Sequence, residues 1–390
     1  MIKQGLRSLY HNYFEKLWFL KPELLDVIGA YEFVLVEPFG AEIVDASSLN
    51  SKTINWVIPS PSAGSGGHIN IFRLIGHLEQ QGFICRVAIA GVSQFTSSEE
   101  AHQFICRQFN PIKAEVFISA ESMPPAWFTV ATSWVSAYTV RNFRSTMKKC
   151  YFIQDFEPFF YPQGSEFALA EETYRFGFHG ITAGQWLADK LRQDYGMKTD
   201  AIAFSYDRHL YRPCPRRHPD QKQVFFYARE TTPRRGFELG ILTLAAVARE
   251  LPQVQFVLAG CDTSRYAIPF EHRNPGVLQL KELPDLYSQC DAALVLSFTN
   301  LSLLPVELMA CGCPVVSNRG ANVEWLLSSD YAVLTEPTVN SLRDGIVNLL
   351  KDDAYRHHLI QAGLAFADTT NWESESRKVA TLFQRLCDEF

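Results

Sequence analysis

The strongest constraint on the fold is a regular alternation that begins at Thr53, in which short β-rich apolar runs are separated by longer amphipathic stretches. This alternation predicts parallel β-sheets covered by helices on both faces, because each helix returns the chain to begin the next strand in the same direction. The predicted fold class is therefore α/β. Strands are predicted in the first half at 53–58, 84–89, 115–118 and 149–153, and in the second half at 224–227, 255–259, 292–296, 314–317 and 331–334.

The length of the chain indicates two domains, since 390 residues exceed the roughly 250 to 300 at which a single core stops growing. Residues 206–222 hold three prolines and four arginines and show no apolar periodicity. We place the domain boundary there, with one Rossmann-like domain at 53–208 and a second at 209–371. Residues 1–52 lie outside the alternation and are predicted to form an accessory helical lead-in with a strand at 33–36.

The charge of the chain argues against a general nucleic-acid binder, because a formal net charge of −6 is not that of a protein with a broad basic face. Arginines are nevertheless crowded between Arg208 and Arg235, which predicts a local anion site. The nine cysteines lack the spacing of a zinc site, and we expect them to be reduced thiols. With no signal-peptide pattern and no apolar run of about 18 residues, a cytoplasmic location is expected.

A glycine loop follows the first predicted strand and precedes a helical pattern. Its residues Gly66, Gly67 and His68 would stand at the helix N-terminus, where unpaired N–H groups favour a phosphate or sugar oxygen. A nicotinamide-type dinucleotide site is disfavoured, because Ile69 occupies the place of the third glycine in the G-x-G-x-x-G fingerprint. Two simpler interpretations stay open, namely a plain turn for the loop and a structural role for His68.

An arginine loop follows the predicted strand at 224–227 and carries Arg229, Arg234 and Arg235 just before Gly236. Like charges crowded at the positive end of a helix are unfavourable unless an anion neutralises them. The loop therefore predicts a site for a diphosphate, with a solvated surface loop as the simpler alternative.

A third segment runs from the strand at 292–296 through a polar loop into a short helix that carries Glu307. A carboxylate among apolar neighbours is costly to bury unless it accepts hydrogen bonds, and sugar hydroxyls are good donors. A helix-terminal acid satisfied by the backbone is the simpler interpretation. Asp155 and Glu157 likewise follow a strand end, where parallel sheets bind ligands. We expect both to bind an acceptor hydroxyl and Asp155 to orient the nucleophile, although a buried pair that caps neighbouring backbone would give the same pattern.

The arginine loop and the Glu307 segment resemble the donor-binding motifs of GT-B retaining glycosyltransferases of family 4. In that family an arginine and a lysine bind the donor diphosphate, and a Glu-x7-Glu element binds the donor sugar and ribose. Arg229 matches the arginine, Arg234 or Arg235 stands at the lysine, and Glu307 matches the ribose-binding glutamate. The first glutamate is absent, since Thr299 occupies its place. The resemblance implies a donor site that comprises Gly66, Gly67, His68, Arg229, Arg234, Arg235, Leu283, Thr299, Asn300, Ser302 and Glu307, with Arg229, Arg235 and Asp155 as catalytic residues.

The resemblance covers most of the chain. Segments 181–187 and 320–325 are similar to the end of the family's first domain and to its late donor-side turn. The resemblance implies two Rossmann-like domains facing across a cleft, with the helix at 372–390 packed back on the first. The amino-acid sequence of segment 151–162 resembles more closely that of a bacterial subgroup, which includes rhamnosyltransferases using dTDP-rhamnose.

The activity implied by the resemblance is transfer of a hexose or deoxyhexose from a nucleotide-diphosphate sugar to a glycan or lipid-linked glycan, with retention, in bacterial surface polysaccharide synthesis. It implies that neither a cofactor nor a metal is required. It also implies contact with the cytoplasmic face of the inner membrane. The missing first glutamate keeps a non-catalytic sugar-nucleotide or glycan-binding subunit as an alternative. A GT-B sugar-nucleotide epimerase is a second alternative, and product formation without an acceptor would distinguish it.

Overall fold

The computed structural model describes residues 26–43 and 45–389. The chain divides into two units, with the division between Glu37 and Pro38. The described part of the first unit holds helix α2 (Val27–Ala30) and a 3-10 turn, η1 (Glu32–Val34). The predicted strand at 33–36 is wrong, because local bonds such as Leu35 N–H to Glu32 O at 2.9 Å close a turn there instead. The apolar residues that suggested a longer lead-in helix lie among residues 1–25, outside the described residues.

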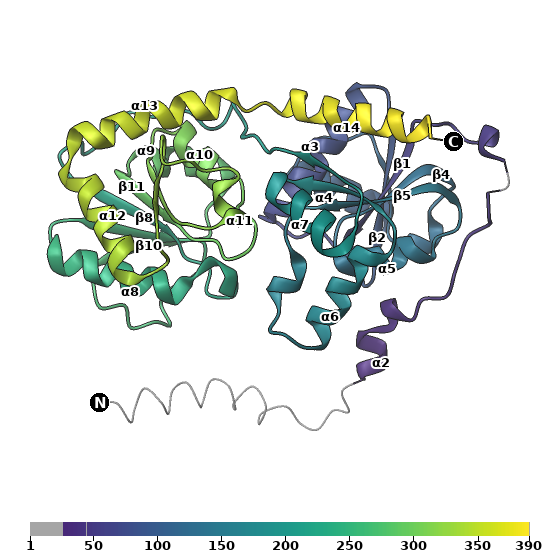
Figure 1. Ribbon diagram of the computed structural model, residues 1–390, viewed down its shortest axis with the longest axis horizontal. Coiled ribbons are helices and arrows are strands. Elements are labelled where there is room, and N and C mark those ends of the chain that lie inside the picture. The colour runs from purple at the N-terminus through teal and green to yellow at the C-terminus, as the bar shows by residue number, and fades with distance from the viewer. Residues whose placement is uncertain (1–25, 44, 390) are drawn as a thin grey trace. The chain divides into compact units, whose positions relative to one another are not determined.

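The second unit begins with a seven-stranded parallel sheet in the order β3-β2-β1-β4-β5-β6-β7. We call this sheet and its helices the N-lobe (Figure 1). Its strands are β1 (Thr53–Pro59), β2 (Ile84–Ala90), β3 (Glu115–Phe117), β4 (Ala126–Ala131), β5 (Thr146–Ile153), β6 (His179–Ala183) and β7 (Thr199–Ile202). Its helices are α3 (Gly66–Gln80), α4 (Ser98–Gln108), α5 (Trp134–Asn142), α6 (Ser165–Glu172) and α7 (Gln185–Tyr195).

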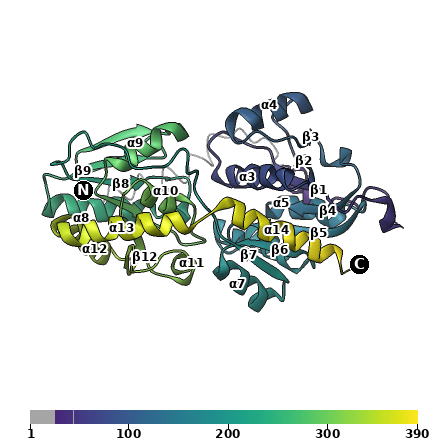
Figure 2. The same ribbon diagram turned by 90° about the horizontal axis from the view of Figure 1, so that it is seen from above.

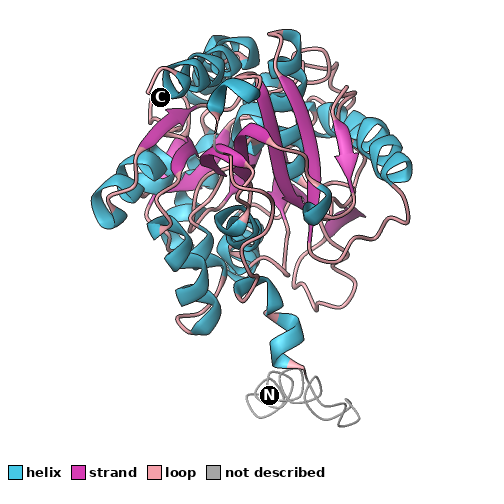
Figure 3. Ribbon diagram, turned by 90° about the vertical axis from the view of Figure 1, so that its right-hand side faces the viewer, coloured by secondary structure: helices cyan, strands magenta, loops and turns pink. Residues whose placement is uncertain are grey.

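Helices cover both faces of this sheet, as the alternation predicts (Figure 2). Successive residues of β1 point to opposite faces, so that Trp56 packs in one core with α3 and α4 while Val57 packs in another with α5 and α7. Figure 3 shows helices on either side of the strands. Strands β4, β6 and β7 were not predicted from the sequence.

A six-stranded parallel sheet follows, in the order β10-β9-β8-β11-β12-β13, and with its helices forms the C-lobe. Its strands are β8 (Gln223–Tyr227), β9 (Gln255–Ala259), β10 (His272–Gly276), β11 (Ala292–Val295), β12 (Val315–Asn318) and β13 (Val333–Thr335). Its helices are α8 (Phe237–Glu250), α9 (Leu283–Ser288), α10 (Leu304–Ala310), α11 (Ala321–Glu324), α12 (Val339–Lys351) and α13 (Asp353–Thr369). The two sheets confirm the predicted pair of Rossmann-like units.

The chain passes between the lobes twice, at the segment after β7 and between α13 and the last helix, α14 (Trp372–Cys387). The two passages are bonded to each other, because Ser205 Oγ and Thr370 Oγ1 lie 2.8 Å apart. Helix α14 then packs on α3 and β7 of the N-lobe (Figure 2). Its Phe383 is fully buried and contacts Phe128.

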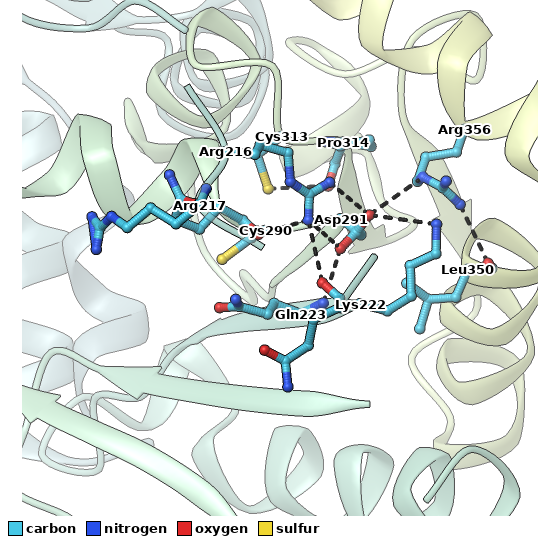
Figure 4. A network of polar contacts seen from close by, with 12 residues as sticks. Arg216, Arg217, Lys222, Gln223, Cys290, Asp291, Cys313, Pro314, Leu350 and Arg356 are labelled. Atoms are coloured by element: carbon cyan, nitrogen blue, oxygen red, sulfur yellow. Dashed lines mark hydrogen bonds and ion pairs between the residues drawn. The ribbon is translucent and has the colours of Figure 1, made fainter. Parts of the chain in front are cut away.

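Several arginines of the segment that joins the lobes are neutralised by carboxylates of the protein. Arg216 donates to both oxygens of the buried Asp291 at 2.9 Å, and the Gln223 N–H donates to the same carboxylate at 2.9 Å (Figure 4). Arg208 pairs with Asp368, and Arg217 pairs with Asp285. The anion site expected from the whole arginine-rich stretch is therefore wrong at Arg208, Arg216 and Arg217, whose charges fasten the segment to the C-lobe.

Candidate functional site

The arginine loop lies at the carboxyl end of β8 and is shaped by Gly236. That glycine follows the 3-10 turn η6 (Pro233–Arg235) and has a φ of 61°. A Cβ there would lie 3.0 Å from side-chain atoms of Leu296 and Phe298. Glycine alone meets both requirements, so the turn sets where Arg234 and Arg235 project.

The side chains of Arg234 and Arg235 are mostly buried, with 25% and 13% of each exposed. Arg235 Nη1 donates to Ser297 Oγ at 2.8 Å and to Asn300 O at 3.3 Å. The Arg234 guanidinium lies 3.8 Å from the ring centroid of Phe160, a contact between the lobes. Burial lowers the pKa of Arg234, and its neighbours Arg235 and Arg229 lower it further. The two guanidinium groups are thus directed at the N-lobe instead of bulk solvent.

Asp155, two residues after the end of β5, is the anion that these arginines face. Its Oδ2 lies 3.5 Å from Arg234 Nε and 3.9 Å from Arg235 Nη2. Thr299 Oγ1 donates to Oδ2 at 3.0 Å, and the Asn300 N–H donates to Oδ1 at 2.7 Å. A carboxylate of one lobe therefore holds the arginine loop and the β11–α10 loop of the other.

Asn300 completes this contact between the lobes. Its Nδ2 donates to Gln154 O at 3.0 Å and to Ala183 O at 2.7 Å. The residue is 1% exposed. The side chains of Thr299 and Asn300, which the resemblance assigns to the donor, are thus bonded to the N-lobe in this structure, and Ser302 is half-buried in the same loop.

Gln154 links the glycine loop to this same contact between the lobes. Gln154 Nε2 donates to Gly67 O at 3.1 Å, and Asn70 Nδ2 donates to Gln154 Oε1 at 2.9 Å. Gly66 stands in open space, because a Cβ on it would have no neighbour within 4 Å. The glycine loop, the end of β5, the arginine loop and the β11–α10 loop therefore come together at the carboxyl ends of their strands, where parallel sheets bind ligands.

His68 is held within the N-lobe. Its Nε2 lies 3.2 Å from Pro59 O and its Nδ1 lies 2.8 Å from Ser65 Oγ. Since a carbonyl only accepts, Nε2 carries the proton and Nδ1 accepts from Ser65. Burial lowers the pKa of His68, which keeps the ring neutral. Both ring nitrogens are occupied, as the simpler interpretation of this residue expected.

Glu157 also differs from its expected position at an acceptor. One carboxylate oxygen accepts from the Trp134 N–H at 2.6 Å, at the start of α5, and the other accepts from Tyr151 Oη at 3.1 Å. Burial raises the pKa of Glu157 to about 8. The acceptor assignment of Glu157 is corrected here, since its side chain points into the N-lobe core and caps a helix.

Glu307 lies on α10 and faces a separate part of the contact between the lobes. Burial raises its pKa to about 7, while Arg73 of α3 and the Tyr211 hydroxyl lower it. In the described part of the chain, Arg73 Nη1 and Arg234 Nε are buried without a hydrogen-bond partner. Buried donors of this kind are suited to an anionic ligand. Leu283, the first residue of α9, is partly buried against the C-lobe core.

Gln154 and Ser297 were not predicted as site residues, and the aromatic residues of segment 156–161, Phe160 among them, were left as core or acceptor-groove lining. Gln154 and Ser297 directly follow predicted strands, so the rule that placed Asp155 at a strand end would also have found them. Phe160 carried no such signal. Within the described residues, no cluster of three or more His, Cys, Asp or Glu side chains is placed to hold a metal ion. None of the described helices is both long enough and apolar enough to span a bilayer.

Solved structures show which fold the chain adopts. The chain superposes on the sucrose-phosphate synthase of Thermosynechococcus elongatus with a TM-score of 0.67 at 15% identity, covering 87% of this chain and 100% of that one. It matches Anabaena HepE, solved in complex with UDP and glucose, with a TM-score of 0.65 at 16% identity, covering 85% and 99%. The glycosyltransferase WaaG, described as involved in lipopolysaccharide biosynthesis, matches with a TM-score of 0.58 at 12% identity, covering 85% and 99%. The fold is the GT-B glycosyltransferase fold.

Sequence comparison identifies the domains more narrowly. The family profile described as WsaF, N-terminal domain, matches residues 93–183, and the profile of the WsaF C-terminal domain matches residues 222–347. The chain thus contains both WsaF-family domains. It is 36% identical over 264 residues to the O-antigen biosynthesis protein RfbC of Myxococcus xanthus. That match covers 66% of this chain and 20% of RfbC, so the chain spans about a fifth of this relative's length.

Proposed function

We propose that the chain is a glycosyltransferase that moves a hexose or deoxyhexose from a nucleotide-diphosphate sugar to a glycan acceptor in the synthesis of a bacterial surface polysaccharide. The observation that carries this proposal is the pair Arg234 and Arg235, buried at the carboxyl end of β8 and facing a carboxylate of the other lobe. The O-antigen relative and the neighbour solved with UDP and glucose support the same class of reaction.

In this proposal the arginines act on the leaving group. The diphosphate gathers negative charge as the glycosidic bond lengthens, and fixed guanidinium groups stabilise that charge most in the transition state. Charge-assisted hydrogen bonds of this kind contribute roughly 1.5 to 3 kcal/mol each. Arg229 lies in the same loop, over the ring of Tyr227 at 5.8 Å, and joins Arg234 and Arg235 on the diphosphate.

Asp155 changes partners in the proposed cycle. In this structure its carboxylate neutralises Arg234 and Arg235 and accepts from Thr299 and Asn300. A diphosphate offers the same arginines more negative charge than one carboxylate, so it competes with Asp155 for them. The released carboxylate is then free to accept the proton of an acceptor hydroxyl, which links acceptor activation to the presence of donor.

Several narrower features of the proposal are supported by the resemblance of the motifs alone. They are retention of the anomeric configuration, family 4 membership, rhamnose from dTDP-rhamnose as donor, catalysis without a metal or cofactor, and peripheral contact with the cytoplasmic face of the inner membrane. The residues Gly66, Gly67, Leu283, Ser302 and Glu307 are proposed to complete the donor site, with Glu307 on the ribose.

A non-catalytic sugar-binding subunit is the second candidate, and one observation favours it. Thr299, which replaces the first glutamate of the donor motif, bonds Asp155 in the contact between the lobes. This side chain is therefore not available for the donor sugar in the arrangement described.

The decisive experiment measures release of nucleoside diphosphate from dTDP-rhamnose, UDP-glucose and GDP-mannose, with and without a glycan acceptor. Arg229→Ala is expected to lower turnover by about 10² to 10³-fold, in line with the loss of one donor to a developing oxyanion. Arg249→Ala, on the last turn of α8, is the matched control and should keep the wild-type rate. Equal rates in Arg229→Ala and wild type would refute the assignment, and binding of donor without any turnover would favour the subunit.

A further inference from the structure

An open groove of about 650 Å³ lies where α7 of the N-lobe meets α11 of the C-lobe. Its size is that of a small-molecule or glycan site, since such pockets measure roughly 300 to 1,000 Å³. Five of its nine lining residues belong to segments 181–187 and 320–325, the two segments of the family resemblance to which the proposed reaction gives no role, and the other four follow on α7. We call this site the tryptophan groove, because Trp186 and Trp325 line it, one from each lobe.

Trp325 is fixed in place by the glycine opposite it. Its indole N–H donates to Asn322 O at 3.1 Å. A Cβ on Gly184, which has a φ of 85°, would lie 2.5 Å from Cε3 of the ring. The missing side chain of Gly184 thus allows the indole to pack against the start of α7, and the ring is held rigidly as one wall of the groove.

The tryptophan groove is continuous with the contact between the lobes. Asn322 Nδ2 donates to Ser297 O at 3.0 Å, and the Leu301 N–H donates to Asn322 O at 3.2 Å. On the other wall, Ala183 O accepts from Asn300 Nδ2 at 2.7 Å, two residues before Gln185 begins α7. A ligand in the groove would therefore lie beside the β11–α10 loop, which is hydrogen-bonded to both Arg235 and Asp155.

The lining suits both the apolar C–H face and the hydroxyl groups of a sugar ring. Indole faces bury the apolar C–H face of such a ring with little loss of conformational freedom. Around them stand the amides of Gln185 and Gln193 and the carboxylates of Asp189 and Glu324, which accept from hydroxyl groups. Asp189 Oδ1 already accepts from Gln185 and Arg192, while its Oδ2 makes no hydrogen bond within the described residues.

The charge of the lining decides which saccharides fit. Each of its three carboxylates pairs with a cation: Asp189 with Arg192, Asp194 with Lys190 and Glu324 with Arg319. Lys190 pairs with Asp194 at 2.7 Å. The one cation among the lining residues, Lys190, is thus already paired, so the groove offers a polyanion no free positive charge and a glycan without charged groups is the better fit.

We propose that the tryptophan groove binds a neutral oligosaccharide, the growing acceptor chain of the transfer reaction, through stacking on Trp186 and Trp325. The inference rests on the proposed function, and it adds a site for sugar units beyond the one that reacts. Affinity and turnover are then expected to rise with acceptor length until the groove is filled.

The test measures binding of neutral rhamno-oligosaccharides and gluco-oligosaccharides of two to six units to the full chain by calorimetry, with a heparin hexasaccharide as the polyanion. Trp186→Ala is expected to weaken binding of the neutral probes at least tenfold, and Trp186→Phe to restore most of it. Tyr355→Ala removes a 37% exposed aromatic side chain on α13 outside the groove and is the matched control. Dissociation constants for UDP, dTDP and GDP should be the same in all three variants and in wild type.

Neutral probes that bind wild type and Trp186→Ala equally, no binding of any neutral probe, or a preference for heparin would each overturn the groove assignment. These outcomes are separable from failure of the proposed function. That function fails when no nucleoside diphosphate binds and no donor is turned over, whatever the glycans do. Circular dichroism of each variant shows whether a loss of binding reflects loss of the fold.

Discussion

Asp155 is the residue at which charge, lobe contact and proposed chemistry meet. Its carboxylate is 3.5 Å from Arg234 and 3.9 Å from Arg235, and it also accepts from Thr299 and Asn300. The side chain was expected to orient an acceptor, and its neighbours were expected on the donor. What the sequence could not reveal is that these groups bond one another, because the partners of Asp155 lie 79 to 145 residues away from it and belong to the other lobe.

We predict that Asp155→Asn raises the affinity for a nucleoside diphosphate about tenfold, which is about 1.4 kcal/mol. The amide keeps the shape of the carboxylate but removes the charge that competes for the arginines. Calorimetry with UDP, dTDP and GDP measures the change. Sugar transfer should fall in the same variant, because the proposed proton acceptor is lost.

The control for this prediction is Asp353→Asn, which removes a carboxylate that pairs with Arg356 on the surface of the C-lobe. Its nucleotide affinity should equal that of wild type. Unchanged or weaker nucleotide binding in Asp155→Asn would show that its carboxylate and the diphosphate do not compete.

Glu307 offers a pH-dependent test of the ribose assignment. Its folded-state pKa is about 7 against an ordinary value of 4.5, so the native state holds the extra proton and folding stability falls as pH rises from about 4.5 to 7. Ribose hydroxyls donate to the ionised form. The affinity of wild type relative to Glu307→Gln should therefore increase about tenfold between pH 6 and pH 8.

The comparison with Glu307→Gln is needed because the terminal phosphate of UDP titrates in the same pH range. Its ionisation affects both proteins alike and disappears from the ratio of their dissociation constants. A ratio that stays constant from pH 6 to pH 8 would contradict a contact between the Glu307 carboxylate and the nucleotide.

At the scale of helices and strands, the glycine that ends the arginine loop is the most informative position. Gly236→Ala is expected to lower the free energy of unfolding by about 1 to 3 kcal/mol, because a non-glycine residue is strained at a φ of 61°. The new Cβ would also press on Leu296 and Phe298. Since Arg234 and Arg235 belong to the turn that Gly236 ends, nucleotide affinity should fall at least tenfold.

Gly196→Ala separates backbone strain from displacement of the arginines. Gly196 ends α7 with a φ of 65°, but a Cβ there meets nothing within 4 Å. Urea unfolding should show a loss of about 1 to 2 kcal/mol in this control, and calorimetry should show wild-type nucleotide affinity. Equal nucleotide binding by both variants would mean that the Gly236 turn does not position the site.

The strands that the sequence failed to predict do not share one physical reason. Burial does not explain β4, because all six of its residues are buried but so are six of the seven residues of β1, which was predicted. In β7 and β10, edge positions admit polar residues, and β10 even contains Pro275. The strands that were predicted, such as β1 and β9, carry the β-branched and aromatic residues that a pleated buried surface selects.

For the whole molecule, the sequence predicted two Rossmann-like units but not how their surfaces bond. Hydrophobic periodicity reports burial within one sheet, whereas the contact between the lobes is built from polar side chains on loops. Asn300 bonds the carbonyls of Gln154 and Ala183, and neither partner could be assigned from local pattern. Loop residues at strand ends could be nominated, but their partners needed the structure.

Asn300→Ala is predicted to loosen this contact and to raise amide hydrogen exchange in both lobes, at residues 154–157 and at residues 297–303. The variant leaves two buried N-lobe carbonyls without donors, which costs about 1 to 3 kcal/mol for each. The matched control is Asn274→Ala. Asn274 Nδ2 also donates to two carbonyls, those of Leu258 and Cys261, but both belong to the C-lobe, so faster exchange should stay within that lobe.

Saturating nucleoside diphosphate should reproduce part of this effect in the wild-type protein. If the diphosphate displaces Asp155 from Arg234 and Arg235, the Asn300 amide loses its carboxylate partner and exchanges faster while the arginine loop becomes protected. Asp155→Asn should show little further change on nucleotide addition, because its arginines are already free of a competing charge. Protection of both loops in wild type would mean that the nucleotide closes the contact between the lobes with Asp155 still in place, and the proposed exchange of partners would then be wrong.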